Sequence, residues 1–184
     1  IIICLYINKT MITNSNKPIK CVSKDFTSNP FFLIQYNGFQ KRFLASFQNK
    51  ENIKQFLTLF IDQSVDELQV KIYDIEDSAC PKEYEGVTTK AKLKDALQQY
   101  EEVVFHNGFH DLMIRHPETG DYIAFDEHGM IFIYTQEDYF SILEDFGLAY
   151  KSNEKLIEEF DHWHYKSQDD VLNLQSLIIE LGLK

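Results

Sequence analysis

The chain contains few of the residues that build disulfide frameworks and nucleotide-binding loops. It has 184 residues, among them three cysteines and seven glycines. Cys4, Cys21 and Cys80 are scattered and form no Cys-x-x-Cys pair, a pattern that favours reduced thiols over disulfides or a cysteine-built zinc site. The glycines form neither a Gly-x-Gly-x-x-Gly nor a P-loop spacing. We therefore expect neither a disulfide framework nor a bound nucleotide, and the sequence indicates no cofactor of another kind.

The sequence also lacks a long apolar run. None approaches about 18 residues, the length that a membrane-spanning helix needs. The apolar stretch over residues 1–7 is short and has neither a basic leader nor a cleavage site, so a secretory signal is not expected. We expect a cytoplasmic protein that binds no membrane. Because Met11 offers an internal start, residues 1–10 are either an extension of the natural chain or a short strand.

Basic residues become scarce after residue 100. Residues 1–100 contain 13 Lys and Arg against 11 Asp and Glu, a net charge of +2. Residues 101–184 contain 5 Lys and Arg against 18 Asp and Glu, a net charge of −13. The net charges of the two parts sum to −11 for the whole chain. All six histidines lie in this second part. A field of this sign repels nucleic acid and anionic lipid and attracts a basic protein, which is therefore the partner that we expect.

The apolar and aromatic content, 44% and 14% of the residues, is sufficient for one buried core. We expect a loose lead-in over residues 1–30 and a single domain over residues 31–184. Asn37-Gly38 predicts a tight hairpin between two strands. In the first half the pattern predicts strands over 31–36 and 43–47, a helix over 51–60, a strand over 68–72, a loop over 76–86 and a helix over 93–100.

The second half of the sequence predicts a β-meander followed by helices. Turns rich in Gly, Asn, Asp and Pro separate four strand-like runs, which are 103–105, 111–115, 122–125 and 130–134. Connections this short make neighbouring strands antiparallel. Three helices are predicted after the meander: from Thr135, over 153–160 and from Ser167. This segregation indicates an α+β fold, an antiparallel meander with helices packed on one side.

The histidines raise one alternative function, a small metal-dependent hydrolase that uses His106, His110, His162 or His164. His162-Trp163-His164 would place both imidazoles on one face if it formed a strand, as many metal sites require. On a helix continued from the preceding residues, the two rings would diverge by about 200°. Neither a His-Glu-x-x-His nor a Gly-x-Ser-x-Gly motif occurs. We therefore expect a protein that is not an enzyme and binds no metal.

Carboxylates cluster in the second half and are interleaved with tyrosines and a tryptophan. Such mixtures are typical of tight interfaces with basic proteins, because aromatic rings anchor the contact while charges speed association and fix its register. The other interpretation is an ordinary acidic surface whose aromatic residues belong to the core. The residues that we predict to bind a partner are Asp121, Asp126, Glu127, Glu137, Asp138, Asp161 and Trp163.

Parts of this second half resemble a known group of proteins. The sequences RHPETGDY (115–122), FDEHG (125–129), FIY (132–134) and HWHYK (162–166) are similar to the small acidic immunity proteins of bacterial polymorphic-toxin and contact-dependent inhibition systems. The resemblance implies a cytosolic, non-enzymatic inhibitor that binds a toxin domain, often a nuclease, and covers or distorts its active site. Our leading hypothesis is therefore an immunity protein for a basic toxin. The alternatives are the hydrolase and a regulatory protein-binding module.

Overall fold

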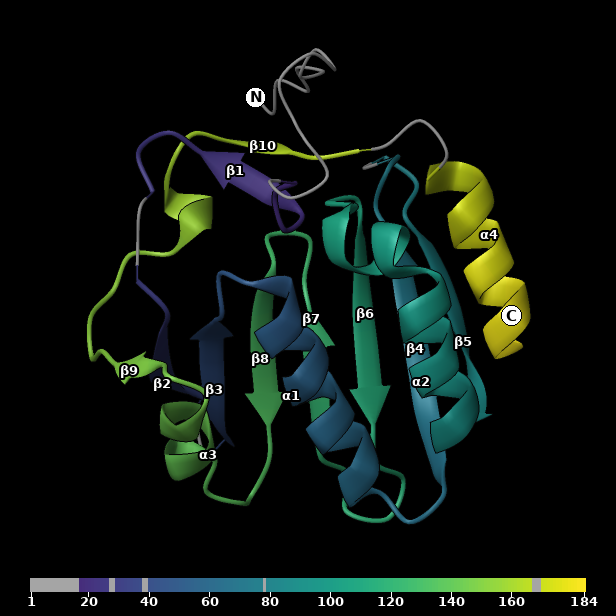
Figure 1. Cartoon of the computed structure of the whole chain (residues 1–184), viewed down its shortest axis with the longest axis horizontal. Coiled ribbons are helices and arrows are strands. Elements are labelled where there is room, and N and C mark those ends of the chain that lie inside the picture. Colours follow the sequence, from purple (N-terminus) through teal and green to yellow (C-terminus); the bar gives the residue numbers. More distant parts are fainter. Residues whose placement is uncertain (1–16, 27–28, 38–39, 78, 167–169) are drawn as a thin grey trace.

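An eight-stranded sheet forms the centre of the molecule (Figure 1). The computed structural model describes residues 17–26, 29–37, 40–77, 79–166 and 170–184. The strands are β1 (Cys21–Ser23), β2 (Phe31–Asn37), β3 (Gln40–Ser46), β4 (Glu67–Asp74), β5 (Lys82–Thr89), β6 (His110–Arg115), β7 (Tyr122–Phe125), β8 (Met130–Tyr134), β9 (Ala149–Tyr150) and β10 (His162–His164). Their order across the large sheet is β5-β4-β6-β7-β8-β3-β2-β9, antiparallel throughout except between β2 and β9.

β1 and β10 form a separate antiparallel pair, which we call the crossing ribbon. In Figure 1 this ribbon runs across the upper end of the large sheet. Its register pairs Cys21 with His164 and Ser23 with His162. The crossing ribbon therefore brings residues near the two ends of the described chain together above the turn that joins β7 and β8.

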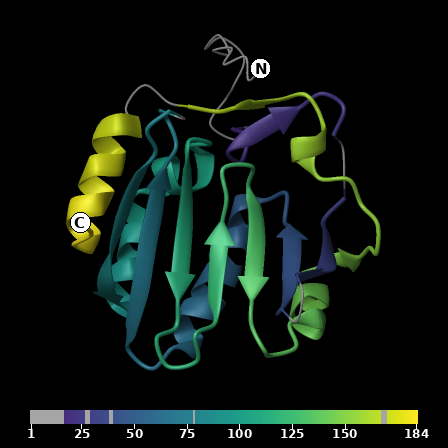
Figure 2. The same cartoon turned by 180° about the vertical axis from the view of Figure 1, so that it is seen from behind.

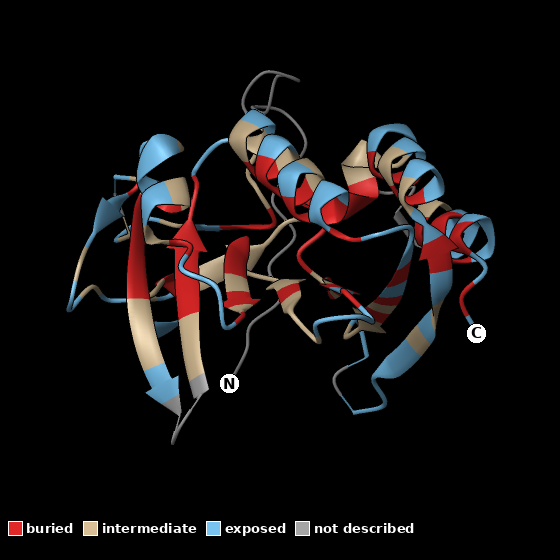
Figure 3. Ribbon diagram, turned by 90° about the horizontal axis from the view of Figure 1, so that it is seen from below, coloured by how far each residue is buried: buried red, intermediate tan, exposed pale blue. Residues whose placement is uncertain are grey.

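The helices lie on one face of the large sheet. They are α1 (Lys50–Gln63), α2 (Lys90–Gln99), α3 (Phe140–Asp145) and α4 (Asp170–Leu181), with a π-helical turn η1 (Glu102–His106) and a 3-10 turn η2 (Ile157–Glu159). α1 and α2 cross the sheet, and no helix crosses the opposite face in Figure 2. Viewed from below in Figure 3, the buried residues of the helices face the sheet. The predicted α+β fold, with a largely antiparallel sheet and helices on one side, is confirmed.

The helix α1 shows why the core lies on this face. Its apolar residues recur at helical spacing, and Ile53, Phe56, Leu57 and Phe60 are all fully buried. Asn49 caps the helix, because its side-chain oxygen accepts a hydrogen bond of 2.8 Å from the backbone N–H of Asn52. The ring of Phe56 packs against Phe47, Tyr139 and Phe146 with centroid distances of 5.1, 6.1 and 5.5 Å. The predicted helix over 51–60 is confirmed, since α1 covers it completely.

The face of the sheet without helices is divided between a small apolar cluster and an open aromatic surface. Phe31, Leu33, Leu44 and Met130 form the cluster, and Phe26, Phe132 and Leu156 pack against it. Farther along this face, the rings of Tyr122 and Tyr134 stack with their centroids 4.2 Å apart. Arg42 donates a 2.7 Å hydrogen bond to the Tyr134 hydroxyl. This open surface combines aromatic rings with a guanidinium group.

Two predicted elements are wrong for reasons of tertiary packing. Residues 103–105 were expected to be a strand, but they lie in the π-helical turn η1, which extends α2. Val103, Val104 and Phe105 are fully buried there, so their apolar run reflects burial on all sides and not strand alternation. Part of the expected loop over 76–86 is strand β5, because it pairs with β4 along its whole length. β5 carries few buried residues, so its sequence lacks the apolar alternation that predicts a strand.

Other boundaries also differ from expectation. The helix predicted from Thr135 begins only at Phe140, because Thr135 and Asp138 accept hydrogen bonds from backbone N–H groups of a preceding turn. The helix predicted over 153–160 is reduced to the 3-10 turn η2, since Leu156 is extended and packs on the small apolar cluster. The expected loose lead-in contains β1. Residues 1–10, Cys4 and the hairpin turn at Gly38 lie outside the described residues.

None of the helices in the described ranges combines the length and the apolar content that crossing a membrane would require.

The packing of α1 gives a direct test of the core. We expect Phe56→Ala to lower the free energy of unfolding by about 3–5 kcal/mol, because it removes a fully buried ring that three other rings contact. The matched control is Gln55→Ala, at the exposed neighbouring position of the same helix, which we expect to stay within about 0.5 kcal/mol of wild type. Urea denaturation followed by circular dichroism measures both. Equal destabilisation by the two variants would contradict this packing.

Candidate functional site

The meander distributes the predicted partner-binding residues over the two ends of the sheet. Asp121 precedes β7, whereas Asp126 and Glu127 follow it, so they lie at opposite ends of that strand. Glu137 and Asp138 follow β8 and therefore lie at the same end as Asp121. Asp161 and Trp163 belong to the crossing ribbon or its approach, at the end of Asp126. The structure thus brings together two separate groups and not one surface of seven residues.

The first group belongs to what we call the acidic end, which comprises residues 64–66, 116–121 and 135–139. Hydrogen bonds join the first two of these loops to each other and the third loop to α1. One Glu118 carboxylate oxygen accepts from the Ser64 hydroxyl at 2.9 Å and from the Val65 backbone N–H at 2.6 Å. The Tyr139 hydroxyl donates to the side chain of Gln63 at the end of α1. The acidic end is therefore held in one arrangement before any partner arrives.

A buried histidine reinforces the acidic end. The ring of His116 stacks on Phe60 with the centroids 4.0 Å apart, and its Nε2 lies 2.9 Å from the Phe60 carbonyl oxygen. The backbone of the same residue closes the β6–β7 turn, since its N–H donates to Asp121 and its carbonyl accepts from Gly120. His116 therefore fixes the turn to α1 from inside the protein.

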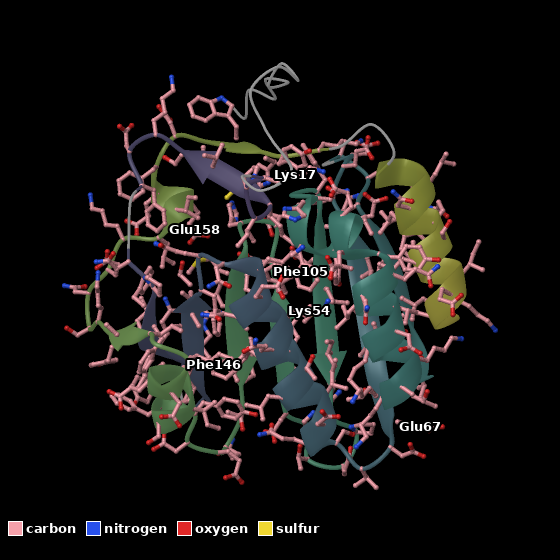
Figure 4. All side chains as sticks on the ribbon, in the orientation of Figure 1. Lys17, Lys54, Glu67, Phe105, Phe146 and Glu158 are labelled. Atoms are coloured by element: carbon pink, nitrogen blue, oxygen red, sulfur yellow. The ribbon has the colours of Figure 1, made fainter. Side chains whose placement is uncertain are left out.

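Carboxylates at the acidic end outnumber their cationic neighbours. Asp66, Glu67, Glu118, Glu137 and Asp138 are exposed and Asp121 is half-buried; Figure 4 labels Glu67 at this end. Within the described ranges, two ion pairs lie here, Lys41 with Asp138 at 3.6 Å and Lys94 with Asp62 at 2.7 Å. Burial, together with the nearby charges of Asp121 and Glu137, raises the pKa of the Tyr139 hydroxyl to about 12. The surface keeps an unneutralised negative field.

The second group lies at what we call the histidine end, formed by the crossing ribbon and the β7–β8 turn (126–129). His162-Trp163-His164 is a strand, so the two imidazoles share a face, as one of the two sequence-based interpretations required. His128 from the turn meets them, with ring centroids 4.9 Å from His162 and 5.2 Å from His164. Each of the three rings places one nitrogen within 4.8 Å of a nitrogen of the other two.

A buried lysine lies beneath this end. Lys20 is fully buried, and its ammonium group donates to the carbonyl oxygens of His110 at 2.7 Å and Phe125 at 3.4 Å. Burial lowers the pKa of the Lys20 amine to about 8, although the carboxylates of Asp111, Asp126 and Glu127 oppose that shift. Burial also raises the pKa of the Asp111 carboxyl to about 8, and a hydrogen bond with Glu127 adds to the increase. The cluster thus combines one buried amine with three carboxyl groups.

Two of the predicted partner-binding residues have internal roles at this end. The Asp126 carboxylate accepts backbone hydrogen bonds from His128 at 3.1 Å and Met130 at 2.7 Å, which fixes the turn. Glu127 is half-buried, and the hydrogen bond from Asp111 lowers its pKa in spite of a larger opposing effect of burial. Asp161 is exposed, and half-buried Trp163 has the Lys24 ammonium group 5.5 Å from its ring centroid. Only Asp161 and Trp163 remain available to a partner here.

The histidines singled out in the sequence do not all gather. His110 is fully buried and its ring nitrogens have no hydrogen-bond partner among the described residues, so burial lowers its pKa well below the ordinary value. His106 Nδ1 lies 2.7 Å from the Pro18 carbonyl oxygen. His128, which the sequence did not single out, takes their place beside His162 and His164. The sequence position of His128 shortly after β7 could have placed it at this end of the sheet. It could not have shown that β10 lies above His128.

A groove of about 710 Å³ adjoins the histidine end, and its walls include Cys21, His106, His128 and Met130. Burial raises the pKa of the Cys21 thiol to about 12, so this sulfur is protonated at neutral pH and does not act as a nucleophile. No arrangement of nucleophile, base and orienting group appears among the described residues lining the groove. The chemistry available at this end is that of imidazole nitrogens and carboxylates.

The buried carboxyl group predicts a pH dependence of stability. The pKa of Asp111 is about 8 in the folded chain against an ordinary value of 3.8, so folding takes up a proton between these values. Wild type should therefore lose stability relative to Asp111→Asn as the pH rises from 5 to 8, by at most about 1.4 kcal/mol per pH unit. The asparagine amide can still donate to Glu127. Urea denaturation of both proteins at several pH values measures the difference, and parallel curves would contradict the assignment.

No family model, curated protein or solved structure matches this chain. Its function therefore has to be inferred from the chemistry of two places, the acidic end and the histidine end. The first offers charge and shape to another macromolecule, and the second offers ligand atoms to an ion.

Proposed function

We propose that the protein is a cytoplasmic immunity protein that binds and neutralises a basic bacterial toxin domain of the nuclease type. The acidic end is the surface that supports this proposal best. Hydrogen bonds tie two of its loops to each other and the third to α1, while its carboxylates exceed the cations that lie among them. A partner would thus meet a fixed negative surface, and little conformational entropy would be lost on binding.

The charge of the acidic end fits an inhibitor of a nuclease. A nuclease binds substrate phosphates through Lys and Arg, and carboxylates can occupy the same cationic positions with charge-assisted hydrogen bonds. Because the whole chain carries a net charge of −11, its field also accelerates the approach of a cationic domain. Asp121, Glu137 and Asp138 supply this charge from the residues predicted to bind a partner.

Apolar and aromatic groups next to these carboxylates can provide the remaining binding energy. Val65 lies within the acidic end with 78% of its surface exposed. Tyr122 follows Asp121 directly, and its ring stacks on Tyr134 on the open face of the sheet. Exposed aromatic rings beside charges are typical of energetically important positions in protein interfaces. The proposed contact surface therefore extends from the acidic end onto the open face.

Charge reversal tests the proposal. We expect Asp121→Lys combined with Glu137→Lys to slow association with the proposed basic toxin domain by about 10-fold or more at low ionic strength. The effect should shrink as salt increases, because screening weakens exposed charges. Stopped-flow association kinetics across a salt series measures it, and growth of cells that express the toxin measures protection.

The matched control reverses two exposed charges away from the acidic end, Asp25→Lys shortly after β1 of the crossing ribbon and Glu180→Lys on α4. This variant has the same net charge as the test variant, so a general field effect would slow both equally. We expect the control to associate within about threefold of wild type. An equal loss in both variants would place the contact elsewhere. Failure of wild type to bind or protect against that toxin domain would overturn the proposal.

A further inference from the structure

Three imidazoles meet at the histidine end, and we propose that they form a binding site for one zinc ion. The rings come from two segments far apart in sequence, His128 from the β7–β8 turn and His162 and His164 from β10. Their centroids are separated by 4.9 Å, 5.2 Å and 5.2 Å. One nitrogen from each ring lies within 4.8 Å of those of the other two. Three neutral imidazoles in such a group form a common zinc ligand set.

The positions of the rings are set by bonds that do not involve the imidazoles. His162 and His164 are two residues apart on a strand, so their side chains emerge on the same face. Pairing with β1 fixes the height of that strand above the sheet. The Cys21 thiol of β1 donates to the His128 carbonyl oxygen at 3.2 Å, which ties the crossing ribbon to the turn. The fold therefore brings the three rings close together before an ion binds.

Hydrogen bonds to the imidazoles orient them for an ion. His162 Nδ1 lies 2.8 Å from the Phe160 carbonyl oxygen, which can only accept, so Nδ1 carries the proton and Nε2 has a free lone pair. His128 Nδ1 lies 3.3 Å from a carboxylate oxygen of Asp126, with the same consequence. A carbonyl or carboxylate behind the imidazole is the usual partner of a metal-bound histidine. Two of the three rings thus have such a partner.

The third ring carries an unpartnered nitrogen. His164 Nδ1 is buried and has no hydrogen-bond partner among the described residues. The backbone of Gly108 closes over it, since a Cβ atom at that position would lie 2.9 Å from this nitrogen and would collide with the Lys20 carbonyl oxygen. A buried nitrogen without a partner is costly in the absence of a ligand or a rearrangement of the ring. A rotation of the ring toward the other two imidazoles would let a nitrogen of His164 bind the ion.

The chemistry of these groups selects zinc over hard cations. Imidazole nitrogens suit zinc and other late first-row metals, whereas calcium and magnesium prefer oxygen ligands. Tetrahedral zinc with bonds of about 2.0–2.1 Å places its ligands about 3.3 Å apart, so the nitrogens need approach by at most about 1.5 Å. The carboxylates of Asp126 and Glu127 next to His128 favour a cation. Because all three rings are only half-buried, water can reach the fourth coordination position.

A bound ion would link the crossing ribbon to the β7–β8 turn. It would thereby hold β10, and with it β1, over the end of the large sheet where Lys20 is buried. An ion that binds the folded chain and not the unfolded chain stabilises the fold by mass action. This role is independent of the acidic end, so either proposal can fail without the other.

Zinc titration of the untagged, chelator-treated full-length protein tests the site. We expect one equivalent of zinc to bind with a dissociation constant of about 1 µM or below in isothermal titration calorimetry. The melting temperature should rise with zinc and not with magnesium. His162→Ala should weaken binding by about 100-fold or more and abolish the rise. Cobalt(II), used as a spectroscopic probe, should show the intense visible absorption of a tetrahedral site in wild type.

Two further variants separate loss of a ligand from loss of the fold. In Asp126→Asn the amide oxygen can still accept from the backbone N–H groups of His128 and Met130, but the amide nitrogen cannot accept from His128 Nδ1. We expect zinc to bind about 10–100-fold more weakly while the circular dichroism spectrum is unchanged. Trp163 lies between the two histidines, on the opposite face of β10. We expect Trp163→Phe to bind zinc as wild type does.

Absence of one-equivalent zinc binding to wild type would overturn the proposal. Wild-type affinity in both His162→Ala and Asp126→Asn would also overturn it, because the zinc would then lie elsewhere. Equal weakening by Trp163→Phe would indicate that disturbance of the strand, and not loss of a ligand, reduces binding.

Discussion

The meander of β6, β7 and β8 determines where the charged groups of residues 111–138 lie. Each reversal of an antiparallel strand sends the next connection to the opposite end of the sheet. The β6–β7 turn and the β8–α3 loop therefore share one end, and the β7–β8 turn lies at the other. This constraint divides the acidic part of the sequence into an outer, carboxylate-rich surface and a half-buried cluster of histidines. The chemistry of the protein follows from that division.

The two ends satisfy their charges in different ways. At the acidic end the carboxylates face solvent, and hydrogen bonds among the loops fix the backbone beneath them. At the histidine end the carboxylates turn inward, where Asp126 holds a turn and Asp111 shares its environment with the buried amine of Lys20. An exposed charge keeps its hydration and acts at long range, whereas a buried charge loses hydration free energy that nearby groups must compensate. One end therefore suits recognition of a macromolecule, and the other suits capture of an ion.

Local sequence patterns were sufficient for the elements that bury one regular face. The helix α1 and the strands β6, β7 and β8 follow from apolar spacing and turn residues alone. The sequence could also place Asp121, Glu137 and Asp138 on neighbouring loops once the meander was predicted. It could not show that β1 and β10 pair, because their partners are more than half the chain apart. The meeting of His128 with His162 and the burial of Lys20 depend on that pairing.

Amide hydrogen exchange, compared between the protein alone and the protein bound to the toxin domain, locates the contact surface without altering any charge. We expect slower exchange on binding in residues 64–66, 116–121 and 135–139, with little change in residues 162–166. Protection confined to the crossing ribbon, with the three loops of the acidic end unaffected, would contradict this expectation.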